Sequence, residues 1–118
     1  MRVWCLKKRT LAFAKDILEA VEKFPARTGA SVIREQVVRS GTSVGANFHE
    51  ADAALTLPDK LKSLVTARKE VHETAYWLAL AQLRWPTSPG LDHALREAAE
   101  LFAILNALVR KATEKDTA

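Results

Sequence analysis

The chain has a single cysteine, Cys5, among 118 residues and so cannot form an intramolecular disulfide. A lone cysteine is typical of a protein from a reducing compartment. No stretch approaches the ~20 consecutive apolar residues that a membrane-spanning helix needs. The first ten residues have no apolar core long enough for a secretory signal. We therefore expect a cytoplasmic protein with no membrane contact.

Aromatic residues make up only 7% of the chain, whereas apolar residues make up 48%. This composition, rich in alanine and leucine, favours close-packed helices over sheets and excludes a disordered chain. Glycine and proline occur four times each, and every proline lies between or at the ends of periodic apolar segments. The length fits one domain with a single core, so residues 1–118 are treated as one unit.

Apolar residues recur at helical spacing in four segments. The first covers about residues 4–23, the second ends near 55, the third covers about 56–84, and the fourth follows residue 88. The expected N-caps are Thr28 or Ser31 for the second segment, Thr56 for the third and Ser88 for the fourth. Because the connecting turns are short, the sequence predicts an all-α, antiparallel up-down-up-down four-helix bundle.

Residues 39–51, RSGTSVGANFHEA, form a polar seam where a helix would normally carry leucines. Gly41 and Gly45 each cost a helix about 1 kcal/mol relative to alanine, so their presence suggests a close backbone approach. In an antiparallel hairpin with residues 56–84, this seam faces a row of acidic and polar side chains. The structural residues predicted for this seam and for the facing row are Arg39, Ser43, Asn47, Glu70 and Glu73.

We predict that Arg39 pairs with Glu70 or Glu73 and that Asn47 makes a buried hydrogen bond between helices. The hydroxyls of Ser40, Thr42 and Ser43 are expected to bond back to the preceding helical turn. The seam then fixes helix register. A second interpretation, compatible with the first, is an oligomer interface at which the glycines admit a neighbouring helix.

Positive charge is concentrated near the N-terminus, where no acidic residue precedes Asp16, and the net charge is +4. Such a cluster is either a solvated helix face or a contact for nucleic acid. The candidate nucleic-acid-binding residues are Arg2, Lys7, Lys8, Arg9 and Lys15, with Arg34, Lys60 and Lys62 as weaker candidates.

Arrangements that would support catalysis or metal binding are missing from the sequence. No glutamate is followed three residues later by histidine, as a di-iron bundle requires. Cys5 has no cysteine or histidine nearby in sequence, which argues against zinc. Phosphate-binding and dinucleotide-binding glycine motifs are absent. We expect no catalytic residues, no metal and no cofactor, and hence a protein that is not an enzyme.

Several motifs together resemble the bacterial family of 23S rRNA intervening-sequence proteins, also called S23 ribosomal protein-like. They are Phe24-Pro25, QVVRS at 36–40, SVGANFHEA at 43–51 and KEVHETAYWL at 69–78. The chain departs from the family pattern at His49, at the turn 54–57 and at Leu61. The first two departures remove positive charge from the second turn and weaken the case for RNA contact there.

The resemblance implies a left-handed four-helix bundle that assembles as a homopentamer. A distant relative, the basic accessory protein of diversity-generating retroelements, binds nucleic acid and a reverse transcriptase, so the partners we expect are further copies of the chain and RNA or a nucleic-acid-processing protein. The resemblance implies no settled biochemical activity. We therefore hold two hypotheses: an oligomeric bundle that binds RNA or a ribonucleoprotein through a basic surface, and a protein-interaction scaffold without a nucleic-acid role.

Overall fold

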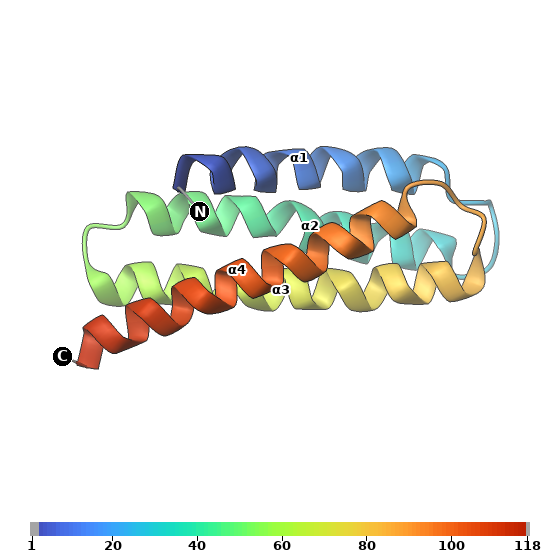
Figure 1. Cartoon of the computed structure of the whole chain (residues 1–118). Coiled ribbons are helices and arrows are strands. Elements are labelled where there is room, and N and C mark those ends of the chain that lie inside the picture. The colour runs from blue at the N-terminus through green and yellow to red at the C-terminus, as the bar shows by residue number, and fades with distance from the viewer. Residues whose placement is uncertain (1–2, 118) are drawn as a thin grey trace.

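The computed structural model describes residues 3–117 of the chain, with side chains from residue 5 to residue 115. Within this range it consists of four helices: α1 (Val3–Glu22), α2 (Ala30–Ala53), α3 (Leu57–Arg84) and α4 (Leu91–Thr117). The described residues contain no strand. The predicted all-α four-helix bundle is therefore confirmed, and the element boundaries lie within a few residues of those expected (Figure 1).

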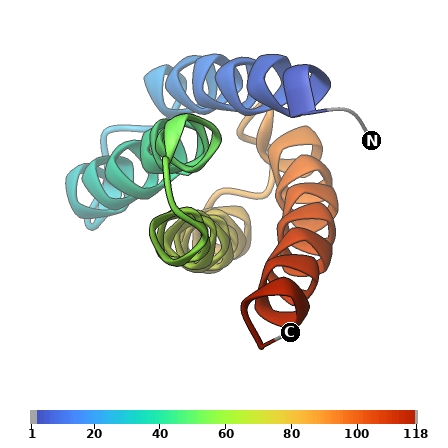
Figure 2. The same ribbon diagram turned by 90° about the vertical axis from the view of Figure 1, so that its left-hand side faces the viewer.

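The helices run alternately up and down along a body of 51 × 22 × 19 Å. Each helix packs against its neighbours in sequence, and α4 closes the bundle against α1. The α1–α2 and α3–α4 turns consequently lie at the same end, opposite the α2–α3 turn (Figure 1). Viewed end-on, α3 is seen nearly along its axis, whereas α1, α2 and α4 are inclined to it (Figure 2).

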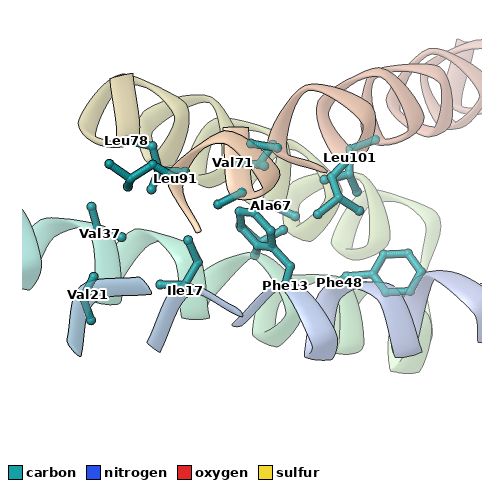
Figure 3. Close-up of a cluster of buried hydrophobic side chains, with 14 of the residues drawn as sticks. Phe13, Ile17, Val21, Val37, Phe48, Ala67, Val71, Leu78, Leu91 and Leu101 are labelled. Carbon is teal, nitrogen blue, oxygen red and sulfur yellow. The ribbon is translucent and has the colours of Figure 1, made fainter. Parts of the chain in front are cut away.

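The core is a continuous apolar cluster to which all four helices contribute (Figure 3). Phe13, Ile17, Val71 and Leu101 are each at most 1% exposed. Fully burying a side chain of this kind contributes about 1.5–3 kcal/mol, which makes the apolar stripes the main source of stability. The bundle thereby fixes where the polar side chains on its seams and ends can lie.

Helix α1 approaches α2 closely at two glycines. A Cβ atom on Gly41 would lie 3.0 Å from Ile17 Cγ1, and one on Gly45 would lie 3.0 Å from Thr10 Oγ1. Both α1 side chains are fully buried. The two glycines of the seam are therefore needed for intramolecular packing of α1, and this packing accounts for them without a neighbouring molecule.

The start of α3 agrees with the sequence pattern. The Thr56 hydroxyl accepts a hydrogen bond from the Asp59 amide at 3.3 Å, and Pro58 lies in the first turn. A proline is tolerated there because the first amides of a helix have no carbonyl partner within it. Asp59 places a negative charge at the positive end of the helix dipole.

The predicted caps of α2 and α4 are wrong. Gly29, rather than Thr28 or Ser31, is the N-cap of α2, and Gly90, rather than Ser88, precedes α4. Both glycines have φ of 87°. This left-handed conformation is strained for residues other than glycine. The backbone conformation required at each turn therefore selects glycine before the helix, rather than a residue whose side-chain oxygen could cap it.

We predict that Gly45→Leu lowers the free energy of unfolding by about 1–3 kcal/mol, because its side chain would overlap the buried Thr10. Ala46→Leu is the matched control, since residue 46 is exposed on the same helix. Urea unfolding followed by circular dichroism measures both. Equal stability of the two variants would contradict the close approach.

Candidate nucleic-acid interface

The basic residues predicted on α1 are largely compensated by acids of the same fold. Lys7 pairs with Asp52 of α2, and Lys15 pairs with Glu19 one turn further along α1. Arg9 pairs with two glutamates of α4. Lys8 is exposed, and Arg2 lies outside the described residues. The ion pairs thus join these cations of α1 to acids of α1, α2 and α4.

Arg9 has the most extensive of these contacts. Its Nε donates to Glu97 Oε2 at 3.2 Å and its Nη2 to Glu100 Oε2 at 2.8 Å, with a further bond to Glu97. The hydrogen bond from Arg9 to Glu97 raises the pKa of the guanidinium, although burial opposes this. A guanidinium that chelates carboxylates in this way is strongly held. Arg9 therefore links α1 to α4 and has little capacity left for a phosphate.

Lys15 differs because its ion pair with Glu19 is exposed to solvent. The hydrogen bond between them raises the pKa of Lys15 and lowers that of Glu19. Pairs of this kind are weak and are screened by salt. Lys15 can therefore exchange its intramolecular partner for an anion in solution, whereas Arg9 cannot do so without loosening α4.

The predicted pairing of Arg39 with α3 is present. Its Nη1 donates to Glu70 Oε2 at 3.3 Å, and its Nη2 bonds to Glu73. Trp77 Nε1 donates to the same Glu73 carboxylate at 3.1 Å. Because Glu70 is only 8% exposed, its charge depends on this cation for compensation. The pair fixes the register of α2 against α3.

The predicted inter-helix hydrogen bond of Asn47 is absent, and this expectation was wrong. Asn47 Nδ2 donates to the Ser43 carbonyl oxygen of its own helix at 2.8 Å, and the Ser43 hydroxyl donates to the Arg39 carbonyl at 2.8 Å. On the facing helix, Thr66 likewise bonds to its preceding turn at 3.0 Å. The carbonyl one turn back is always within reach, so these polar groups are satisfied locally.

The contact between α2 and α3 is made instead by two buried hydroxyls. Thr74 Oγ1 lies 2.8 Å from Ser40 Oγ and 2.7 Å from the Glu70 carbonyl oxygen, and Ser40 Oγ donates to Gln36 at 2.7 Å. Thr74 has one proton and must share it between two acceptors. Back-bonding of Ser40 confirms the expectation, but its contact with α3 was not predicted.

A second group of cations lies where the α1–α2 and α3–α4 turns meet. Lys23, Arg27 and Arg84 line a hollow of about 330 Å³, and Arg27, Arg34 and Arg84 line an adjoining open depression. No carboxylate lines either one. We call Lys23, Arg27, Arg34 and Arg84 the cationic loop end.

Arg34 is held in place by contacts within the fold. Its Nε donates to the Val21 carbonyl oxygen at 3.3 Å, and its Cζ lies 5.9 Å from the Phe24 ring centroid. Within the described part of the chain, neither Arg27 nor Arg84 forms an ion pair. Neither arginine was predicted from the sequence as a binding residue. Each lies two residues from a turn proline, and the up-down topology brings those two turns together.

The opposite end of the bundle carries a smaller hollow of about 210 Å³. Lys60, Lys111 and Lys115 line it around an apolar floor that includes Leu64 and Leu108. Asp52 also lines this hollow, and its carboxylate already pairs with Lys7. The negative charge makes this end a weaker anion site than the cationic loop end.

Two further properties bear on function. Between residues 5 and 115, no three histidine, cysteine or acidic side chains lie close enough to hold a metal ion together. Across the helices described, no segment has the length and apolar character required to traverse a lipid bilayer.

The comparisons with known proteins agree with the geometry. The family model described as "23S rRNA-intervening sequence protein" matches residues 2–107. A protein of unknown function from the S23 ribosomal protein family of Bacteroides thetaiotaomicron is similar in structure, with a TM-score of 0.83 and 29% identity. The alignment covers 93% of this chain and 99% of that one. No curated protein is significantly similar to the chain.

We predict that Arg39→Met lowers the free energy of unfolding by about 1–3 kcal/mol, because the buried Glu70 loses its compensating charge. Arg96→Met is the matched control, since the Arg96–Asp92 pair is exposed and should change stability by less than about 1 kcal/mol. Chemical unfolding compares the two. If Arg39→Met is as mild as the control, the seam pair does not stabilise the register.

Proposed function

The chain belongs to the family of 23S rRNA-intervening sequence proteins, and we propose that it is a non-enzymatic, cytoplasmic bundle that binds RNA through the cationic loop end. The supporting observation is that Arg27 and Arg84 adjoin one hollow with no carboxylate in its lining. Cations without an intramolecular partner are the ones that can neutralise phosphates and release their counterions.

The charge distribution favours this end over the N-terminal helix. Arg9 and Lys7 bind acids from other helices, so an RNA phosphate would have to replace those acids. Arg27 and Arg84 are exposed and incur no such loss. Guanidinium groups also donate two parallel hydrogen bonds to a phosphate. Lys15 can contribute secondarily, because its ion pair is exposed.

We also propose that the bundle self-associates through the outer face of α3, where large apolar side chains are exposed at helical spacing. Val65, Tyr76 and Leu83 are 37%, 63% and 82% exposed. Residues 65, 72, 76, 79 and 83 follow steps of seven, four, three and four, and so share one stripe. The resemblance implies five copies. Self-association is also expected under the alternative hypothesis of a protein-interaction scaffold.

Replacing both loop-end arginines tests the RNA proposal. We expect Arg27→Gln/Arg84→Gln to weaken binding of a structured RNA about tenfold or more at ~50 mM salt, and to reduce the slope of log affinity against log salt by about 2. The measurement is a mobility-shift titration at several salt concentrations.

Lys69→Gln/Arg110→Gln is the control, since it removes the same charge from exposed positions elsewhere. Equal weakening in both double variants would mean that net charge rather than this site binds RNA. Absence of binding by the unmodified protein at ~50 mM salt would refute the RNA function.

The oligomer proposal predicts a light-scattering mass well above the 13.1 kDa of one chain, and five times that mass for a pentamer. Tyr76→Lys/Leu83→Glu should shift the protein towards the single-chain mass, because two charges would be buried at the contact. Leu55→Glu is the control, as Leu55 is 98% exposed at the α2–α3 turn. A monomeric unmodified protein would refute self-association.

A further inference from the structure

Two buried polar atoms at the cationic loop end have no hydrogen-bond partner. They are Trp85 Nε1 and Ser88 Oγ, and no other buried side-chain nitrogen or oxygen among the described residues is in this situation. Both residues line the same 330 Å³ hollow as Lys23, Arg27 and Arg84. A buried donor without an acceptor destabilises the folded state, so each one calls for an explanation.

The surrounding contacts hold these two residues in place without satisfying them. The Trp85 amide donates to the Ala81 carbonyl oxygen at 2.7 Å, and the Ser88 amide donates to the Trp85 carbonyl oxygen at 3.0 Å. The Trp85 ring packs against Phe24 with centroids 5.1 Å apart. The amides of Trp85 and Ser88 are therefore satisfied, whereas the indole N–H and the hydroxyl are not.

Helix electrostatics explain part of the charge but not these donors. Arg84 lies in the last turn of α3 and Lys23 directly follows α1, where cations favour the negative end of the helix dipole. Arg27 lies in the turn, outside either helix. The dipole gives no role to Arg27, to the indole N–H or to the Ser88 hydroxyl.

We propose that this hollow is a phosphate-binding site. An oxyanion there would accept hydrogen bonds from Trp85 Nε1 and Ser88 Oγ, while Arg27, Arg84 and Lys23 compensate its charge. A guanidinium group favours phosphate because the phosphate oxygens accept two parallel N–H hydrogen bonds from it. The volume lies at the lower end of the range for small-molecule sites, and leaves space for a sugar attached to the phosphate.

The phosphate has two possible sources, a backbone phosphodiester of RNA and free phosphate. The first deepens the proposed RNA function and rests on it, whereas the second is independent of it. In either case the ligand must approach donors that are shielded from solvent. Binding therefore displaces the α3–α4 turn slightly and changes the surroundings of the Trp85 indole.

The test is a nuclear magnetic resonance titration of the ¹⁵N-labelled full chain that follows the indole N–H signals. The Trp85 signal is assigned by elimination with Trp4→Phe and Trp77→Phe. Inorganic phosphate, and separately a short RNA, are added at constant ionic strength set with chloride. We expect a saturable shift of the Trp85 signal, about tenfold weaker apparent affinity in Arg27→Gln/Arg84→Gln, and unchanged affinity in Lys69→Gln/Arg110→Gln.

The outcomes separate this site from the RNA function. Saturation by both ligands supports a site that accepts a phosphodiester. Saturation by phosphate without any RNA binding supports a free-phosphate site and overturns the RNA function alone. RNA binding in the mobility shift with a Trp85 signal unmoved by either ligand overturns the phosphate site alone. Equal phosphate affinity in the two double variants also overturns the phosphate site.

Ser88→Ala removes one proposed donor and leaves the cations in place. We expect this variant to bind phosphate several-fold more weakly than the unmodified protein.

Discussion

The close approach of α1 to α2 at Gly41 and Gly45 is the constraint on which the rest of the bundle depends. A Cβ at either position would crowd Ile17 or Thr10 of α1, so α1 would have to move outward from α2. Its present position brings Lys7 to Asp52 and Arg9 to the glutamates of α4. The same contact that packs the core therefore also determines which basic residues are compensated.

This coupling changes the interpretation of the basic N-terminal helix. Five cations before Asp16 suggest an anion-binding face when they are read along the chain. In the bundle, the acids that compensate Lys7 and Arg9 are 45 and 88 or more residues away. Charge compensation is thus a property of helix packing, and it makes the arginines of the cationic loop end better candidates for binding an anion than Lys7 or Arg9.

The contact between α2 and α3 combines two kinds of polar interaction. Ser40 and Thr74 form a buried hydroxyl contact in the middle of the interface, and Arg39 with its two glutamates forms a charged contact at the edge. Hydroxyls and a compensated charge pair are less stabilising than apolar contacts, but they tolerate few alternative alignments. They give the polar side chains of this segment a structural role in packing α2 against α3.

The sequence pattern was sufficient to predict the four helices, their antiparallel order, the cap at Thr56 and the pairing of Arg39. They follow from helical periodicity, from the residue types that cap a helix and from counting outward from a short turn, all of which are local properties. It did not predict the caps at Gly29 and Gly90, the Ser40–Thr74 contact or the cationic loop end. Those depend on the backbone direction at the turns and on which helix faces meet, because side chains far apart in sequence become neighbours only when the core packs.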